Sequence, residues 1–231
     1  MSALPALRSV TRSAAAVPGP ARPRIAEIDA VSRPARTFTG DFYYTHRAAD
    51  RLWLAHGDVA GKGLPAAIVM AMIQEELEQR IASCAEAACN PATTMRRLHE
   101  FLLPLMPQNR FATGVIAHLH GDGTLTLANG GHCPPLIVRN DGTIEELAST
   151  GPLLGILPRA AWRAHVTRLE PGERLVLYSD GVTEATLGEE ELGVDGLKRI
   201  LSSVTDTRGI LEALRERCVT DDMTLVVVRR V

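Results

Sequence analysis

The chain has 231 residues, of which 45% are hydrophobic, and a formal net charge of −2 at pH 7. This length suits one large domain or two small ones, and the composition is that of an ordinary globular protein. The small net charge gives no electrostatic reason to expect binding to nucleic acid or to an anionic membrane. No apolar stretch approaches the roughly 20 residues that a membrane helix needs, so we expect a soluble, cytoplasmic protein.

Residues 1 to 24 differ in composition from the rest of the chain. They are rich in Ala, Pro, Ser and Arg and contain no acidic residue. Such a segment cannot bury enough apolar surface to order itself. A transit peptide has a similar composition, but we favour a disordered N-terminal tail, with the folded part running from residue 25 to residue 231.

The first predicted elements are strands, followed by two helices. Residues 25 to 31 alternate between apolar and polar, and residues 41 to 47 and 51 to 57 are joined by a short polar link that suits a hairpin. A helix is predicted from Pro65 to about residue 83, because proline is tolerated in the first helical turn. A second helix is predicted over residues 91 to 103, with Asn90 as its N-cap.

Beyond the second helix the hydrophobic pattern changes to a period of two. Four short runs, at residues 112 to 120, 124 to 129, 135 to 140 and 143 to 148, are separated by turn sequences and predict an antiparallel meander. A strand near residues 173 to 179, a helical segment from Leu197 to Cys218 and a final strand around residues 225 to 228 follow. Helices grouped apart from antiparallel strands indicate an α+β layer fold.

The four cysteines do not indicate a metal site or a secreted protein. They lie at positions 84, 89, 133 and 218, without the paired short spacing that zinc binding uses and without a secretory signal. We therefore expect Cys84, Cys89, Cys133 and Cys218 to be reduced, buried thiols.

The stretch GDVAGKG, at residues 57 to 63, raises the question of phosphate binding. A phosphate-binding loop needs four residues between its first two glycines and a Ser or Thr after the lysine. Here three residues separate Gly57 from Gly61, and Gly63 follows Lys62. We therefore interpret the stretch as a turn that presents Asp58, and we favour a solvated lysine over a phosphate ligand for Lys62.

Aspartates recur at the predicted strand ends. Asp41 begins a strand, Asp58 and Asp180 each end one, and Asp221 and Asp222 begin the last. Neighbouring strands lie about 4.8 Å apart, so a sheet can bring such carboxylates together, and divalent cations such as Mg²⁺ or Mn²⁺ would remove their repulsion. Two such ions can share a water and lower its pKa for attack on a phosphoester. Taken singly, each aspartate is also an ordinary turn residue.

Six motifs in order carry a family resemblance: TGDFYY, GDVAGKGLPAA, FATGV, NGGHCPP, LYSDGVTEA and DDMTLVVVR. Together they resemble the SpoIIE/RsbU-type branch of the PPM (PP2C-like) serine/threonine phosphatases, over about residue 25 to the C-terminus. The resemblance implies a four-layer α-β-β-α sandwich with two central antiparallel sheets and a two-metal centre of manganese or magnesium. It also implies a substrate, a phosphoserine or phosphothreonine on an anti-sigma-factor antagonist of the STAS-domain type.

The resemblance also implies which residues bind the metals. Asp58 would bridge the two ions, the Val59 carbonyl would be a further ligand, and Asp41 would support the same pair. Asp180 and Asp221 would hold the other metal. Asp58 and Asp180 are therefore the residues on which we expect catalysis to depend.

Further positions bear on the candidate site. Glu184 matches a position that in some relatives contributes to a weaker third metal. The first motif usually reads GGDFYD, whereas this chain has Thr39 and Tyr44 at its edges, and loss of the outer acid is expected to weaken one metal or alter substrate access. His132 is a candidate general acid, but we favour a turn histidine whose ring hydrogen-bonds the backbone.

The leading hypothesis is a metal-dependent phosphoprotein phosphatase that uses no protein nucleophile. One alternative is a pseudophosphatase, in which the fold binds a phosphorylated partner without hydrolysing it. Another is a hydrolase of small phosphoesters, because substrate choice would lie in surface loops such as residues 184 to 196.

Overall fold

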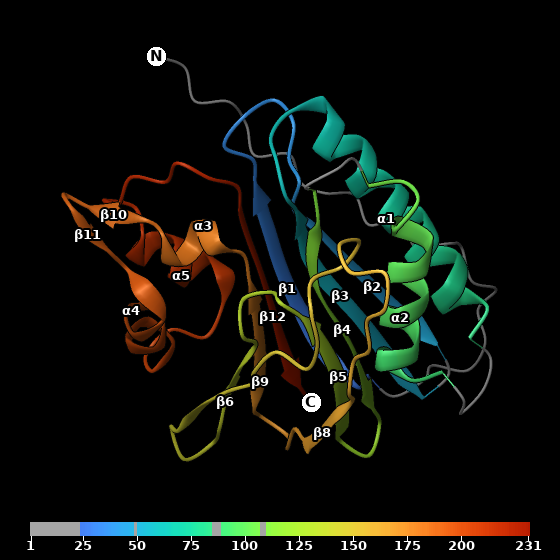
Figure 1. The fold of residues 1–231 in the computed structure, drawn as a ribbon. Coiled ribbons are helices and arrows are strands. Elements are labelled where there is room, and N and C mark those ends of the chain that lie inside the picture. The colour runs from blue at the N-terminus through green and yellow to red at the C-terminus, as the bar shows by residue number, and fades with distance from the viewer. Residues whose placement is uncertain (1–23, 49, 85–88, 107–109) are drawn as a thin grey trace.

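The structure is a computed structural model that describes residues 24–48, 50–84, 89–106 and 110–231. The predicted tail at residues 1 to 24 lies, except for Arg24, outside these residues. The described residues form two five-stranded antiparallel sheets that face each other, with helices on the outer side of each (Figure 1). The predicted four-layer α-β-β-α sandwich is therefore confirmed.

The first sheet joins the two ends of the folded chain. Its first strand, β1, pairs along its whole length with the last, β12, from Ala26 opposite Arg230 to Arg33 opposite Met223. This pairing brings the segment before β12 beside the end of β1. In spatial order the strands are β1 (Ala26–Arg33), β12 (Met223–Arg230), β9 (Arg174–Tyr178), β6 (Leu136–Val138) and β7 (Ile144–Glu146).

The second sheet contains the predicted hairpin. Phe42 in β2 lies opposite Gly57 in β3, and Ala48 lies opposite Arg51, as the short polar link predicts. Most of β3 is buried, because the first sheet covers one face and helices cover the other. In spatial order the strands are β2 (Phe42–Ala48), β3 (Arg51–Val59), β4 (Ala112–His120), β5 (Thr124–Gly130) and β8 (His165–Arg168).

The predicted meander is wrong in one respect. All four strands exist, but β4 and β5 lie in the second sheet, whereas β6 and β7 lie in the first. The segment 131 to 135 carries the chain from one sheet to the other. Alternation of apolar and polar residues shows that a segment is a strand, but it does not show which of two facing sheets the strand joins.

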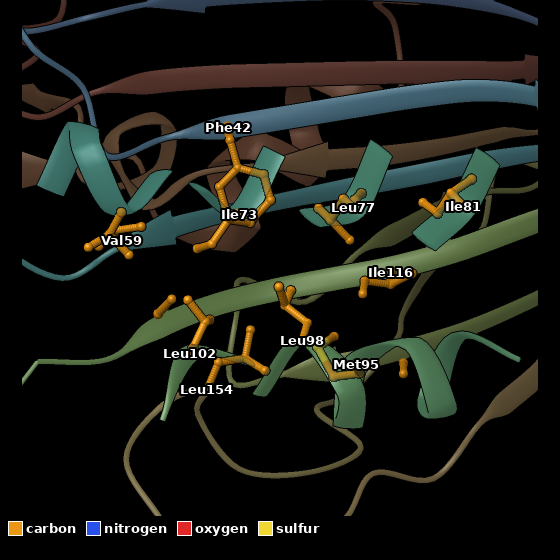
Figure 2. Packing of buried hydrophobic residues seen from close by; sticks show 14 of the residues in the cluster. Phe42, Val59, Ile73, Leu77, Ile81, Met95, Leu98, Leu102, Ile116 and Leu154 are labelled. Carbon is orange, nitrogen blue, oxygen red and sulfur yellow. The ribbon is translucent and has the colours of Figure 1, made fainter. Parts of the chain in front are cut away.

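Two helices, α1 (Leu64–Ala82) and α2 (Pro91–Leu102), cover the second sheet. The Asn90 side chain accepts a hydrogen bond of 2.8 Å from Ala92 N, which confirms the predicted N-cap. Figure 2 shows Ile73, Leu77 and Ile81 of α1 on one stripe, facing the same apolar layer as Leu98 of α2. None of the helices in the described ranges is long and apolar enough to cross a membrane.

The first sheet is covered by shorter elements: α3 (Asp180–Thr183), the hairpin β10 (Thr186–Leu187) and β11 (Glu190–Glu191), α4 (Gly193–Leu201) and α5 (Thr207–Ala213). The prediction of one helical segment from Leu197 to Cys218 is wrong. The Asp206 side chain accepts a hydrogen bond of 2.8 Å from Gly209 N and begins a new helix. An N-cap of this kind favours a helix start at the next residue, so the predicted segment contains two helices and not one.

The cysteine prediction is also corrected. Cys84 and Cys89 form a disulfide with their Cα atoms 5.9 Å apart, Cys133 is partly buried and Cys218 is exposed. Cys84 follows α1, which ends at Ala82, and Cys89 precedes α2, which begins at Pro91, so the disulfide links the facing ends of the chain segments at the two helices. A separation of five residues in the sequence does not by itself indicate this link.

Candidate metal centre

The four candidate aspartates lie at strand ends of both sheets. Asp41 directly precedes β2, and Asp58 is the penultimate residue of the adjacent strand β3. Asp180 lies two residues after β9, and Asp221 lies two residues before its neighbour β12. The Asp58 carboxyl interacts electrostatically with Asp180 and Asp221 across the sandwich, so the two sheets contribute to one acidic region.

Burial and mutual repulsion raise the pKa values of Asp58 and Asp180. Burial, reinforced by Asp180, Asp221 and Asp222, raises the pKa of Asp58 to about 6. Burial together with the negative charge of Asp221 raises the pKa of Asp180 above its ordinary value. A nearby cation would lower both pKa values, because it favours the ionised forms.

Asp41 is the most buried of the four. Its residue is 4% exposed, and its Oδ2 atom has no hydrogen-bond partner. Burial raises its pKa to about 8, and the negative charges of Asp58 and Asp222 add to the shift. A buried carboxylate oxygen without a partner is energetically unfavourable, and a bound cation would satisfy it.

The backbone approaches closely at two glycines beside these aspartates. A Cβ atom on Gly40 would lie 2.6 Å from Asp58 Oδ1 and 2.8 Å from the Val59 carbonyl oxygen. A Cβ atom on Gly181 would lie 2.2 Å from the Asp222 carbonyl oxygen. Only glycine permits these contacts, so the two strand ends of each sheet close tightly around the acidic region.

Asp222 has a role that the sequence did not reveal. Its carboxylate accepts hydrogen bonds from Ala35 N at 2.8 Å and from Gly40 N at 3.2 Å. Asp222 therefore fastens the loop between β1 and β2, and with it Asp41, to the start of β12. The only signal in the sequence was its position next to Asp221.

Ser179 is a second positioning residue that sequence reasoning missed. Its hydroxyl donates to the Asp222 carbonyl at 3.0 Å and accepts from Thr224 N at 2.8 Å, and its side chain is fully buried. These bonds fix the turn before β12 against the end of β9. Both hydrogen-bonding capacities of the hydroxyl are therefore used to hold this turn.

A pocket of about 90 Å³ lies beside the acidic region. Three aspartates line it, together with Arg36, Phe38 and Lys62 among others, whereas Asp41 and Asp180 do not. Lys62 lies just before α1, and its Nζ is 3.3 Å from Asp221 Oδ2. The expectation of a solvated lysine is therefore incomplete, because a half-exposed side chain is also ion-paired.

The carboxylates lie near one another but do not form a complete set of metal ligands. In the described ranges, no three His, Cys, Asp or Glu side chains lie close enough together to hold a metal ion as they stand. Glu184 lies at the rim of the region: its backbone N–H donates to the Asp180 carbonyl at 2.8 Å. Partial burial and the charge of Asp180 raise the Glu184 pKa.

Tyr44 and Thr39 differ in their relation to the acidic region. The Tyr44 side chain packs against the apolar cluster beneath α1 and α2, and burial raises its pKa to about 12. Thr39 Oγ1 accepts a hydrogen bond of 3.0 Å from Asp41 N, so it supports the turn that presents Asp41.

His132 lies in the interior. One ring nitrogen is 2.8 Å from Thr113 Oγ1 and the other is 2.7 Å from His56 Nδ1, and burial lowers the His132 pKa to about 4. The ring nitrogens therefore have two side-chain partners that the sequence interpretation did not include. The pocket lining does not include His132, and His56 was not identified from the sequence.

The residues present fit a divalent cation that prefers oxygen ligands. The donors are carboxylates and one backbone carbonyl, all hard oxygen atoms, and they include the unpartnered Asp41 Oδ2. Mg²⁺ and Mn²⁺ prefer such donors, whereas Zn²⁺ sites favour His and Cys.

These observations define the class of the protein: it has a PP2C-like fold with an acidic region at the strand ends. The chain belongs to the SpoIIE family: residues 48–231 match the family model described as Stage II sporulation protein E.

Three comparisons place the chain more closely. It is 29% identical to the phosphoserine phosphatase RsbU of Bacillus subtilis, over 88% of this chain and 63% of RsbU. It superposes with a TM-score of 0.74 on the RsbU and RsbW domains of Rv1364c from Mycobacterium tuberculosis, at 25% identity, over 89% of this chain and 61% of that one. It also superposes on RsbX in complex with magnesium, with a TM-score of 0.69 at 16% identity, over 91% of this chain and 98% of RsbX. The chain thus spans less than two thirds of the length of RsbU.

Proposed function

We propose that the chain is a divalent-metal-dependent phosphatase that hydrolyses phosphoserine or phosphothreonine on a protein. The observation that carries this proposal is the convergence of Asp41, Asp58, Asp180 and Asp221 from the two sheets. Burial and the neighbouring negative charges raise the pKa values of Asp41, Asp58 and Asp180, and a bound cation would favour their ionised forms. Membership of the SpoIIE family, which has the phosphoserine phosphatase RsbU as a relative, supports the same activity.

The proposed ligands form two groups. Asp58 lies between them, with the Val59 carbonyl and Asp41 on the side of the second sheet. Asp180 and Asp221 form the group on the first sheet. Two ions held there would supply an ionised water for in-line attack on phosphorus and would neutralise the developing charge. The ion is Mg²⁺ or Mn²⁺, consistent with the oxygen donors and with the magnesium complex of RsbX.

The chain's own residues would perform the remaining tasks. Asp222 and Ser179 hold the loop 35 to 40 and the turn before β12 in place, so that the carboxylates keep their separation. The pocket lined by Asp58 and Lys62 is the place where the phosphoryl group would lie. Glu184, at the rim, is positioned to hold a third, weaker ion.

The substrate we propose is a phosphorylated anti-sigma-factor antagonist of the STAS-domain type. This finer assignment rests on the resemblance to the RsbU branch. Residues 184 to 196, which include the hairpin β10–β11, form the surface that would recognise the sequence of the protein substrate. A small-molecule phosphoester would enter the same pocket without touching that hairpin.

The decisive experiment measures phosphate release from a phosphoserine protein and from an aryl phosphate, with Mn²⁺ or Mg²⁺ present or chelated. Asp58→Asn should lower the rate at least about 100-fold, because loss of a bridging carboxylate removes several kcal/mol of transition-state stabilisation. Glu212→Gln, at an exposed position in α5, is the control and should leave the rate unchanged. Metal-independent release, or full activity of Asp58→Asn, would contradict the proposal.

One observation favours a second candidate, a binding-only pseudophosphatase. In the part of the chain that the structure describes, the carboxylates do not form a ready-made cage. Calorimetry separates the two functions: binding of a phosphoprotein without uptake of Mn²⁺ would support the pseudophosphatase, and uptake of Mn²⁺ followed by turnover would exclude it.

A further inference from the structure

Lys62 connects the two sides of the acidic region. It lies between the end of β3 and Leu64, the first residue of α1, and its ammonium is 3.3 Å from Asp221 Oδ2. Asp221 belongs to the turn before β12 in the opposite sheet. The side chains are 55% and 39% exposed, and both residues line the same pocket.

The charge of Lys62 acts on more than one carboxylate. Its ammonium lowers the pKa of Glu184 and so opposes the burial and the neighbouring aspartates that raise it. Asp58, Asp180 and Asp221 surround the same region. Lys62 is therefore a monovalent counter-ion in the place where divalent cations are proposed to bind.

This ion pair is weak enough to be exchanged. A half-exposed pair contributes little to stability, because water screens the attraction and a long side chain must be ordered. A divalent cation on Asp221 would compete with the ammonium for the same oxygen and would repel it at short range. Lysine carries its charge on a flexible four-carbon stem, so the ammonium can move without a change of backbone.

The pocket offers a second partner for the released ammonium. A phosphoryl group that enters beside Asp58 would place its oxygens on the same lining that contains Lys62. A lysine ammonium binds phosphate as a point charge and does not need the fixed geometry of an arginine.

We infer that Lys62 is an exchangeable counter-ion: it neutralises Asp221 before metal binds, and it binds a phosphoryl oxygen of the substrate once metal has replaced it. The first half concerns the metal-free protein and stands on the ion pair alone. The second half rests on the proposed phosphatase function.

The first test is calorimetric titration of the metal-free protein with Mn²⁺. Lys62→Met should bind Mn²⁺ about two- to five-fold more tightly, since the ion no longer displaces an ammonium. Lys62→Arg keeps the charge and should bind as the wild type does. Arg36→Met removes an equal charge from the same pocket lining and should change the affinity less than Lys62→Met does. Equal or weaker Mn²⁺ binding by Lys62→Met would overturn the inference.

The second test measures inorganic phosphate as a ligand of the Mn²⁺-loaded protein, and KM for an aryl phosphate. Lys62→Met should weaken phosphate binding and raise KM about ten-fold, because the loss of one hydrogen bond to a charged group has about this effect. A merely structural defect would weaken metal binding and phosphate binding together. We expect Lys62→Met instead to strengthen Mn²⁺ binding and to weaken phosphate binding. Unchanged phosphate affinity would overturn the second half. Absence of wild-type turnover would instead count against the phosphatase function, and the Mn²⁺ titration would still decide the first half.

Discussion

Asp41 makes the stability of the metal-free protein depend on pH. Burial raises its pKa to about 8, against about 4 in an unfolded chain. Between these values the folded protein binds more protons than the unfolded chain, so its stability falls as pH rises through this window. We expect the unfolding midpoint of chelator-treated protein to fall between about pH 5 and pH 8. Added Mn²⁺ should raise the midpoint more at the higher pH, where the carboxylates are ionised.

The variant Asp41→Asn is the control for this prediction. The amide has nearly the shape of the carboxyl but does not titrate, so the decline with pH should become shallower, by at least about 1 kcal/mol over the window. That corresponds to about 2 to 4 °C for a chain of this size. The burial-raised pKa of Asp58, about 6, leaves a residual decline at lower pH. A slope as steep as that of the wild type would mean that Asp41 is not the titrating group.

Gly40 is a residue whose side chain the site cannot accommodate. In Gly40→Ala the methyl group would meet Asp58 Oδ1 and the Val59 carbonyl oxygen, both proposed ligands, at 2.6 and 2.8 Å. We expect Mn²⁺ affinity to fall at least about ten-fold, which is the usual effect of disturbing the groups that orient a metal ligand. Gly121→Ala is the matched control, because its nearest contact would be an ordinary 3.8 Å to Asp50 O. Equal Mn²⁺ affinities for the two variants would show that the close approach at Gly40 does not shape the metal centre.

At the scale of single elements, α1 is anchored by one stripe of buried side chains. Leu77 is fully buried against the second sheet, whereas Ile68 on the outer face is 52% exposed (Figure 2 shows Leu77). Leu77→Ala should lower the free energy of unfolding by about 2 to 5 kcal/mol, because it leaves a cavity in a packed layer. Ile68→Ala should change it by about 0.5 kcal/mol or less. Denaturant titration measures both, and comparable losses would contradict the assignment of the buried face.

The elements that were predictable from sequence are those whose signals are local. The hairpin of β2 and β3 follows from two alternating runs and a short link, and α2 from the Asn90 cap and an apolar stripe. The assignment of β6 and β7 to the first sheet was not predictable, since it depends on partners such as β9, about 40 residues away. The break between α4 and α5 has a local signal in Asp206, a residue type that favours the N-cap position.

The same division holds for the candidate site. Aspartates at strand ends were visible in the sequence, because each follows or precedes an apolar run. The groups that position them were not visible: Asp222 bonds Ala35 and Gly40, which are 187 and 182 residues away in the chain. His56 and His132 form a buried pair that no local sequence pattern indicates. Contacts that depend on how the two sheets pack against each other can be identified only from the three-dimensional structure.

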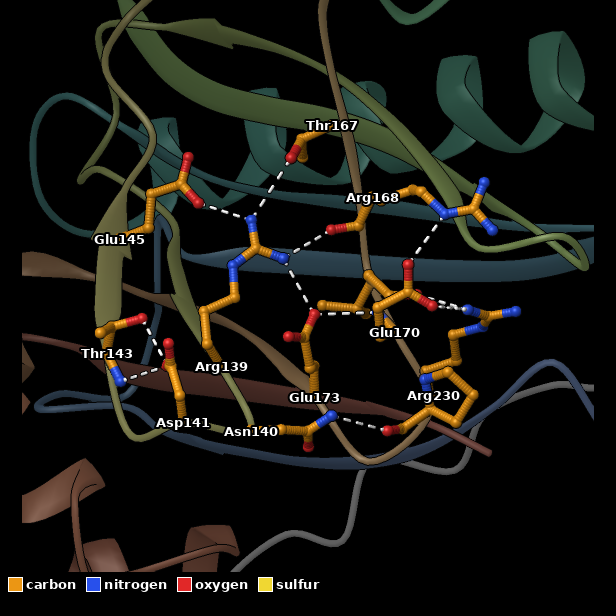
Figure 3. Close-up of polar contacts among 12 residues, drawn as sticks. Arg139, Asn140, Asp141, Thr143, Glu145, Thr167, Arg168, Glu170, Glu173 and Arg230 are labelled. Atoms are coloured by element: carbon orange, nitrogen blue, oxygen red, sulfur yellow. Dashed lines mark hydrogen bonds and ion pairs between the residues drawn. The ribbon is translucent and has the colours of Figure 1, made fainter.

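At the scale of the whole molecule, Arg139 ties the two sheets together. It directly follows β6 of the first sheet, and its guanidinium donates to the Arg168 carbonyl in β8 of the second sheet at 2.6 Å (Figure 3). The same group pairs with Glu173 at 2.9 Å and with Glu145 at 2.5 Å. Glu173 is 7% exposed, so this network is partly shielded from water.

Replacement of Arg139 therefore tests how the two sheets are held at this end. Arg139→Met keeps much of the stem but removes every donor, and it leaves Glu173 buried without its cation, so we expect a loss of about 1 to 3 kcal/mol in unfolding free energy. Arg215→Met is the control: its ion pair with Glu212 has side chains 64% and 69% exposed and should be worth about 1 kcal/mol or less. Because the network lies between β6 and β8, away from the pocket lining, Mn²⁺ affinity measured at a temperature where both variants are folded should stay at the wild-type value. Equal destabilisation by the two variants would mean that the ion pairs of Arg139 are as weak as any on the surface, and that apolar packing alone joins the sheets.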